Sequence, residues 1–253
     1  MRFIVTADTD IGTTKDTNQD SVLVKHAIYQ EQEVLMAIVC DGMGGLSKGE
    51  LASATVIRAF NQWFDEELEK ELNPLDMQTI GSKWECMLKD LNLKISEYGI
   101  DIGASLGTTF SGILFVDDSY VVAHVGDTRI YHLGKELMQL TEDQTFIARE
   151  IKKGTITKEM AKTDKRRNML LQCIGASKMV EPQIFYGTTQ KGTYLLCSDG
   201  FRHEISEKEI YETLKAKQMH DKEMMHQKIR YLMEQVKIRQ EKDNISAILI
   251  KVD

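Results

Sequence analysis

Residues 34–45 read VLMAIVCDGMGG, an apolar run that ends in a carboxylate and a glycine-rich turn. The apolar part, Val34–Cys40, has the length and composition of a buried strand. It is the longest apolar run in the chain, and it is much shorter than the roughly 20 residues that a membrane-spanning helix needs. Asp41 therefore stands at the tip of a buried strand, where an unpaired charge is costly.

Two further aspartates stand beside apolar strands. Asp199 follows the run Tyr194–Cys197, and Asp243 comes shortly before the run Ile245–Ile250. If the strands are neighbours, the carboxylates converge with that of Asp41 and need cations in order to coexist. Oxygen ligands without a histidine or cysteine cluster favour magnesium or manganese over zinc. Two such ions can activate a water molecule and bind a phosphoryl group.

Apolar periodicity predicts two long helices after the glycine-rich turn. The first is expected over about 47–70, and the second begins at Asn73-Pro74. Their core stripes are Ala52, Val56, Ala59, Phe60 and Trp63, and then Met77, Ile80, Trp84, Leu88, Leu91, Ile95 and Tyr98. Ser206 and Glu209 have the spacing of a capping box and predict a further helix. Another helix is marked by Met225, Ile229, Leu232 and Val236.

The remaining apolar and β-branched runs predict strands that are grouped rather than alternating with helices. These strands are Thr108–Val116, Tyr120–Val125, Arg129–Leu133, Thr193–Cys197 and Ile245–Val252. Strands on both sides of a helical block favour an α+β layered sandwich over a doubly wound parallel sheet.

Composition and charge indicate one large globular domain over residues 1–253. Within it, residues 141–180 are polar, basic and poorly periodic, and we interpret them as an inserted flap with short helices. The formal net charge of −7 argues against a nucleic-acid partner. Four widely separated cysteines and an N-terminus without a signal-peptide pattern predict reduced thiols, no membrane partner and a cytoplasmic location. We expect a monomer.

The order of short motifs resembles that of the metal-dependent protein phosphatases of the 2C type, in their short bacterial form, over nearly the whole chain. Each motif is weak alone, but seven follow one another in the family's order. They are Gly12-x-x-Lys15-x-x-Asn18-Gln19-Asp20, Asp41–Gly45, Gly107–Thr109, Val125–Tyr131, Thr141–Gln144 with Arg167-Asn168 and Ile174-Gly175, Ser198–Phe201, and Asp243–Ser246.

This resemblance implies a four-layer α-β-β-α sandwich, with helix pairs on either side of a central antiparallel β-sandwich. It also implies a protein serine/threonine phosphatase in which a water molecule held between two Mn²⁺ or Mg²⁺ ions attacks the phosphate. The residues around the ions would be Asp41 as the bridge, the Gly42 carbonyl on one ion, Asp199 and Asp243 on the other, and Asp20 on metal-bound waters. The substrates would be phosphorylated proteins, the products of a serine/threonine kinase.

Asp127, together with Asp199, matches the weaker third-metal site of bacterial relatives, so the resemblance allows a third ion. Lys15 stands where the family usually has an arginine that grips the substrate phosphate. A lysine keeps the attraction but loses the bidentate grip, so Lys15 is expected to bind phosphate more weakly.

Met43 stands where eukaryotic relatives often carry a histidine that is proposed as the general acid. A thioether cannot donate a proton, so the leaving group must take its proton from another source. His203, close to Asp199 in the sequence, is one candidate, although a surface histidine at a helix start is the simpler interpretation. Substrate contacts are expected in the flap, from Lys152, Lys153, Lys158, Lys162, Lys165, Arg166 and Arg167.

Three other functions were weighed against the phosphatase. A nucleotide site at Gly42–Gly45 would use backbone amides at a helix start, but the loop lacks the Gly-Lys-Ser/Thr ending of a P-loop. Asp8-x-Asp10-x-Gly12 fails the requirements of a calcium-binding EF-hand loop at three positions. A catalytically weak or inactive relative that binds phosphoproteins stays open because of Lys15.

Overall fold

The computed structural model describes residues 3–43, 48–161, 164–167 and 169–253. Its centre is a pair of stacked five-stranded sheets in which every strand pairing is antiparallel. One sheet has the order β1 (Phe3–Asp10), β10 (Ile245–Val252), β9 (Gly192–Cys197), β6 (Arg129–Leu133) and β7 (Leu137–Gln139). The other has the order β2 (Ser21–Tyr29), β3 (Gln32–Cys40), β4 (Phe110–Val116), β5 (Ser119–Val125) and β8 (Gln183–Thr188).

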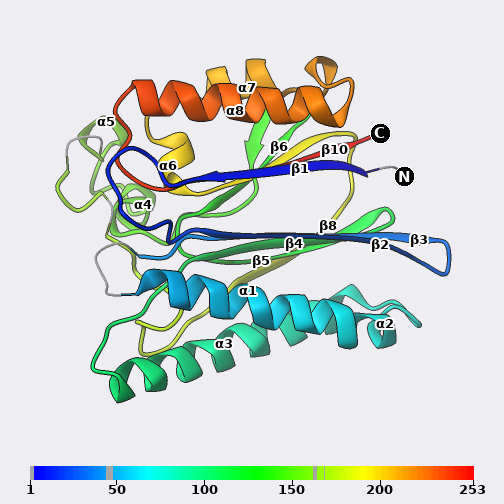
Figure 1. Ribbon diagram of the computed structural model, residues 1–253, viewed down its shortest axis with the longest axis horizontal. Coiled ribbons are helices and arrows are strands. Elements are labelled where there is room, and N and C mark those ends of the chain that lie inside the picture. Colours follow the sequence, from blue (N-terminus) through cyan, green and yellow to red (C-terminus); the bar gives the residue numbers. More distant parts are fainter. Residues whose placement is uncertain (1–2, 44–47, 162–163, 168) are drawn as a thin grey trace.

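Helices cover the outer face of each sheet, which completes the predicted four layers (Figure 1). The β2–β8 sheet is covered by α1 (Gly49–Glu66), the short α2 (Leu68–Glu71) and α3 (Met77–Asp101). The β1–β7 sheet is covered by α7 (Glu207–Leu214) and α8 (Lys222–Ile238), with a 3₁₀ turn at Ala216–Gln218 between them. The short helices α4 (Phe146–Lys152), α5 (Lys158–Ala161) and α6 (Asp199–Arg202) lie at one end of the sandwich. The α+β sandwich expected from the sequence is confirmed.

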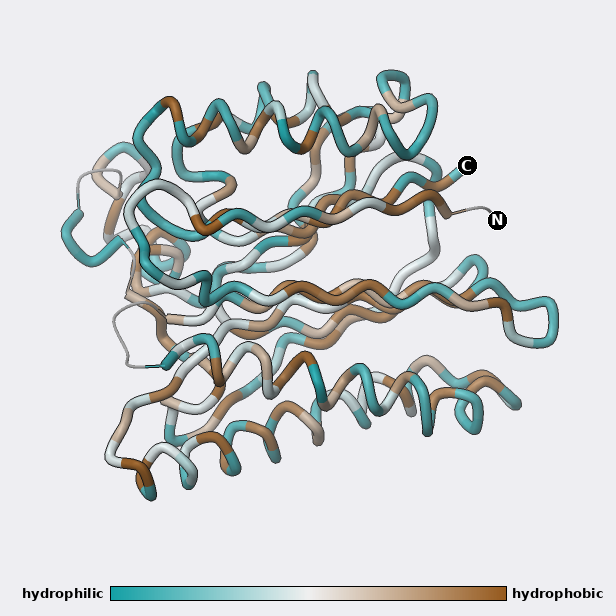
Figure 2. The backbone as a smooth tube through the Cα atoms, viewed as in Figure 1, coloured by the Kyte–Doolittle hydropathy of each residue, from teal (hydrophilic) through white to brown (hydrophobic). Residues whose placement is uncertain are grey.

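Strand β3 is apolar without interruption because both of its faces are buried. Its side chains alternate between the two layers that it separates: Val34, Met36, Ile38 and Cys40 pack with α1 and α3, and Leu35, Ala37 and Val39 pack against the other sheet. A strand that is covered on both faces has no solvent side on which polar residues would alternate. Figure 2 shows the same concentration of apolar residues along the central strands.

Several element boundaries differ from the sequence predictions. The described part of the first helix begins at Gly49 and ends at Glu66, where a separate turn, α2, follows. The second long helix begins at Met77 rather than at Asn73-Pro74, because the Asp76 side chain accepts a hydrogen bond from the Gln78 amide and caps it. Tyr98 was predicted to be in the core but is 51% exposed, so the buried stripe ends at Ile95. Among the described residues, no helix is both long enough and apolar enough to cross a bilayer.

Candidate active site

Antiparallel pairing brings the predicted acidic residues to one end of the sandwich. Ser21 pairs with Cys40, so Asp20 and Asp41 extend from neighbouring strands β2 and β3 at the same edge. Ala247 pairs with Cys197, so the segments that carry Asp199 and Asp243 leave β9 and β10 at a shared edge of the other sheet. The stacking of the two sheets then faces one pair of carboxylates toward the other.

Backbone contacts fix the tip of β3. The Asp41 amide donates to the Thr109 hydroxyl at 2.9 Å, and the Asp41 carbonyl accepts from the Thr109 amide at 2.9 Å. The next residue, Gly42, has no room for a side chain, because a Cβ there would lie 2.6 Å from the Gly49 carbonyl oxygen and closer still to that of Gln19. Glycine is therefore required at position 42 by close backbone packing. The predicted Gly44 and Gly45 lie outside the described residues.

Asn244 holds the loop that carries Lys15 and Asp20 against the start of β10. Its side-chain amide donates to the carbonyls of Ile11 at 2.9 Å and Thr17 at 3.2 Å. Its side-chain oxygen accepts from the Gln19 amide at 3.0 Å. Asn244 belongs to the Asp243–Ser246 motif, but its position in the sequence does not indicate this role. The structure makes it the residue that positions this loop.

The carboxylates are close enough to perturb one another strongly. Burial raises the pKa of Asp41 well above its usual range, and the charges of Asp20, Asp199, Asp127 and Asp243 raise it further. Burial also raises the pKa of Asp20 to about 7, with added repulsion from Asp199 and Asp243. The pKa of Asp199 is raised by burial, although Arg202 opposes the shift. Grouped buried carboxylates of this kind are typical of functional sites.

The same carboxylates fit hard divalent cations. Both carboxylate oxygens of Asp20 and one of Asp199 are buried in the described part of the chain without a hydrogen bond of good geometry, although the hydroxyls of Ser198 and Ser246 lie close enough to lower the pKa of Asp20. Buried oxygens of this kind are costly unless they are paired or bind a metal ion. Among the described residues, however, no three acidic, histidine or cysteine side chains already converge on one point. The ions would therefore need water or carbonyl oxygens in their shells, which suits Mg²⁺ and Mn²⁺ better than Zn²⁺.

Lys15 lies inside this acidic group. Its Nζ is 2.9 Å from Asp243 Oδ1, and its side chain is 29% exposed. Burial alone would lower the pKa of Lys15, but the hydrogen bond to Asp243 and the charges of Asp41 and Asp199 raise it overall. Lys15 is therefore a cation of the site and not a solvated surface lysine.

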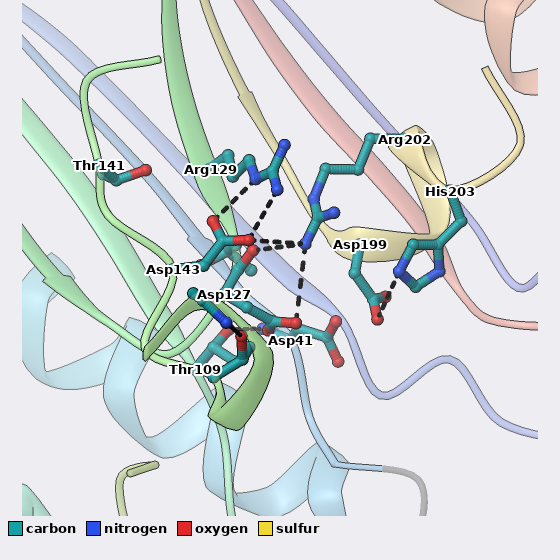
Figure 3. Close-up of polar contacts among 12 residues, drawn as sticks. Asp41, Thr109, Asp127, Arg129, Thr141, Asp143, Asp199, Arg202 and His203 are labelled. Carbon is teal, nitrogen blue, oxygen red and sulfur yellow. Dashed lines mark hydrogen bonds and ion pairs between the residues drawn. The ribbon is translucent and has the colours of Figure 1, made fainter. Parts of the chain in front are cut away.

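Asp127 lies in a second buried cluster next to the first (Figure 3). Arg129 forms a bidentate pair with Asp143, with distances of 2.8 and 2.7 Å. Arg202 Nη2 is 3.7 Å from Asp127 Oδ2 and 3.8 Å from Asp143 Oδ2. Arg202 and Asp143 were not singled out from the sequence, since their partners lie 75 and 14 residues away.

His203 does not stand at a helix start, as the simpler interpretation held. It follows the last residue of α6, and its ring nitrogens lie 3.6 Å from Asp199 Oδ2 and 3.7 Å from Glu241 Oε2. Glu241 in turn accepts hydrogen bonds from the amides of Lys242 and Asp243. His203 therefore links two segments that carry acidic site residues.

Three of the basic residues predicted to contact substrate pair with acidic neighbours. Lys152 binds Glu142, and Lys153 binds Glu150. Arg166 forms its ion pair with Asp164. Lys162 and the side chain of Lys158 lie outside the described residues. The structure gives the flap cations the contacts of an ordinary charged surface, and a docking role stays a prediction.

Sequence comparison identifies related proteins over most of the chain. Residues 12–249 match the family model described as protein phosphatase 2C. The chain is 31% identical over 215 residues to the serine/threonine phosphatase stp of Listeria innocua, which covers 83% of this chain and 82% of that protein. It is also 31% identical over 206 residues to the protein phosphatase PhpP of Streptococcus pneumoniae, with 80% of each chain covered.

Solved structures with the same fold cover the whole molecule. The serine/threonine phosphatase Stp1 from Staphylococcus aureus superposes with a TM-score of 0.86 at 27% identity, covering 100% of this chain and 96% of that one. The catalytic domain of the phosphatase PstP, in complex with two manganese ions, superposes with a TM-score of 0.79 at 28% identity over 99% of both chains. Motif order, strand topology and these matches agree: the chain belongs to the protein phosphatase 2C family.

Proposed function

We propose that this protein is a metal-dependent phosphatase that hydrolyses phosphoserine and phosphothreonine in other proteins. The observation that carries the proposal is the group of three buried carboxylates, Asp20, Asp41 and Asp199, with the more exposed Asp243 beside them, at the meeting edge of the two sheets. Such a group has no structural benefit by itself, because like charges in a buried place repel one another. A bound cation would neutralise their charges and so explain why they lie together. The names of the relatives support the same activity.

Two Mn²⁺ or Mg²⁺ ions are the proposed cofactors, as in the manganese complex of PstP. Asp41 and the Gly42 carbonyl would bind on the β3 side, Asp199 and Asp243 on the opposite side, and Asp20 would accept hydrogen bonds from metal-bound waters. When bound, the ions supply a hydroxide near neutral pH and positive charge for the phosphoryl oxygens. The protein contributes rigid placement, because each carboxylate stands at a strand end that is fixed by the core.

Lys15 is the proposed phosphate-binding side chain. Its ammonium group is already held at the acidic group by Asp243, beside the carboxylates that would hold the ions. A lysine acts as a point charge, whereas arginine forms a planar fork. We therefore expect Lys15 to assist substrate binding more than it assists the chemical step, so that Lys15→Ala raises KM for an aryl phosphate and changes kcat less.

The direct test is manganese-dependent hydrolysis of p-nitrophenyl phosphate and of a phosphothreonine peptide. Activity is expected to require Mn²⁺ or Mg²⁺, to disappear with a chelator and to be lost in Asp41→Asn and Asp199→Asn. Asp90→Asn, a matched change on the exposed face of α3, is the control and is expected to be fully active. A wild-type protein that is folded and binds Mn²⁺ but turns over neither substrate would refute the phosphatase proposal.

That last outcome would favour the second candidate, an inactive relative that binds phosphoproteins. The observation in its favour is the ion pair between Lys15 and Asp243, which occupies one proposed metal ligand with an internal cation. A fluorescent phosphopeptide titrated against the protein distinguishes the two. A binding module would retain the peptide unchanged, and an enzyme would release phosphate from it.

Other parts of the proposal concern the cell. We propose that the substrates are proteins phosphorylated by a serine/threonine kinase, and that the protein acts in the cytoplasm as a monomer of one domain with a flap over about 141–180. The four cysteines, all in the described part of the chain, are free, and three of them are buried, which suits a reducing compartment. Light scattering tests the monomer, and phosphoproteomic comparison of a deletion strain with its parent tests the substrates.

A further inference from the structure

Arg202 places a buried positive charge where the family resemblance places a metal ion. It is the last residue of α6, the short helix that begins with Asp199. Its guanidinium donates from Nη2 to the Asp127 carbonyl oxygen at 3.0 Å. The same nitrogen lies 3.7 Å from Asp127 Oδ2 and 3.8 Å from Asp143 Oδ2 (Figure 3). The Arg202 side chain is only 12% exposed.

Two arginines already offset much of the negative charge of this cluster without a metal. Asp127 and Asp143 contribute two negative charges and Arg129 and Arg202 two positive ones, while Asp199 adds a further negative charge close to both Asp127 and Arg202. Arg129 is engaged by its bidentate pair with Asp143, by its hydrogen bond to the Tyr131 hydroxyl and by Glu207, whose Oε1 lies 3.9 Å from Arg129 Nη1. Arg202 is therefore the counter-ion left for Asp127. A divalent ion bound to Asp127 would add excess positive charge beside a buried guanidinium, which is costly at low local dielectric.

We propose that Arg202 replaces the third metal ion, so that this chain binds two ions and keeps Asp127 as the partner of an arginine. The inference rests on the proposed two-ion function. It differs from the sequence expectation that Asp127 and Asp199 share a third ion. Arg202 also joins three segments that a third ion would otherwise join in part: helix α6 with Asp199, the turn with Asp127, and Asp143 at the start of the predicted flap.

The test is the number of Mn²⁺ ions bound, measured by equilibrium dialysis of the full chain with metal analysis. Wild type is expected to bind two ions, and Asp127→Asn is expected to leave that number unchanged. Arg202→Met keeps the side-chain length and removes the charge, so it is expected to bind three ions. The double variant Arg202→Met with Asp127→Asn is expected to return to two.

Arg239→Met is the matched control, because Arg239 pairs with Glu209 at the surface, away from this cluster. It is expected to bind two ions. The proposal is overturned if wild type binds three ions and Asp127→Asn loses one, or if folded Arg202→Met binds only two. If Arg202→Met does not fold, the comparison of wild type with Asp127→Asn still decides. Fewer than two ions in wild type would instead contradict the proposed function.

Discussion

Asp20→Asn is expected to make the metal-free protein more stable at alkaline pH. Burial raises the pKa of Asp20 from 3.8 to about 7. The folded protein therefore keeps this proton to a higher pH than the unfolded chain does. The contribution of the Asp20 carboxyl to the free energy of unfolding is therefore fully present below pH 3.8 and is lost as the pH rises through 7. A shift of about three pKa units corresponds to about 4 kcal/mol of unfolding free energy.

Asparagine keeps the shape of the side chain but cannot ionise, so the variant escapes this loss. By the same linkage, the stability gained by Asp20→Asn over wild type is expected to grow by about 2 kcal/mol between pH 5.5 and pH 8. The assay is urea denaturation in excess chelator at a series of pH values. Asp90→Asn, on the exposed face of α3, serves as the matched control and is expected to follow wild type at every pH.

In the presence of Mn²⁺, wild type should become more stable than Asp20→Asn. An ion at a hundredfold excess over its dissociation constant adds about 2.7 kcal/mol to a folded protein that binds it. Wild type is expected to gain more than Asp20→Asn, which has lost an acceptor for metal-bound water. If Asp20→Asn in chelator has the same pH dependence as wild type, or is less stable at pH 8, then the pKa of the Asp20 carboxyl is not raised by its burial among the other carboxylates.

Three further outcomes follow from other parts of the structure. Gly42→Ala should destabilise the fold by about 1–3 kcal/mol through overpacking, measured by urea denaturation. Gly103→Ala, where a Cβ meets open space but φ is +62°, should cost only the backbone strain of that φ, about 1 kcal/mol, and a larger loss at Gly103 than at Gly42 would contradict the packing argument. Asn244→Ala should lower the free energy of unfolding by about 2–4 kcal/mol, because three hydrogen bonds are lost, and should weaken Mn²⁺ binding measured by calorimetry. An unchanged Mn²⁺ affinity would show that Asn244 does not position the loop that carries Lys15 and Asp20. Burial lowers the pKa of His124 to about 4. The neutral His124 ring therefore contributes about 3 kcal/mol to the free energy of unfolding above pH 6.5, and this contribution is lost as the pH falls toward 4. In chelator, His124→Gln should lose less stability than wild type between pH 6.5 and pH 4, and an identical loss in both proteins would refute this assignment.

The strands that carry the site could be predicted because burial on both faces leaves an unmistakable apolar run, as in β3. Strands β1, β2 and β8 were not predicted individually. Their side chains are mostly half-exposed and mix polar with apolar residues, so local composition does not distinguish them from loops. Their place becomes evident only through pairing with β10, β3 and β5, which depends on residues far away in the chain.

Asp41, Asp199 and Asp243 could be identified because each has a local signal, a carboxylate beside an apolar run, whereas Asp20 and Asp127 could be identified only through the family resemblance. Arg202 and Asp143 have no such signal. Their importance lies in partners that only the fold brings near, such as the Asp127 carbonyl 75 residues from Arg202. Lys15 could be assigned from the resemblance, but its ion pair with Asp243 could not, since that contact joins the two ends of the chain.

At the site, carboxylates that repel one another are carried by backbone segments that pack closely together. The buried carboxylates of Asp20, Asp41 and Asp199 repel one another and the half-exposed Asp243, so they would separate unless the segments that carry them were held firmly. The backbone holds them: a Cβ at Gly42 would overlap the carbonyl of Gln19, next to Asp20, and one at Gly200 would overlap that of Asn244, next to Asp243. The core stabilises this arrangement through strands buried on both faces. Part of the affinity for divalent ions therefore comes from relief of a repulsion that the fold imposes before any ion binds.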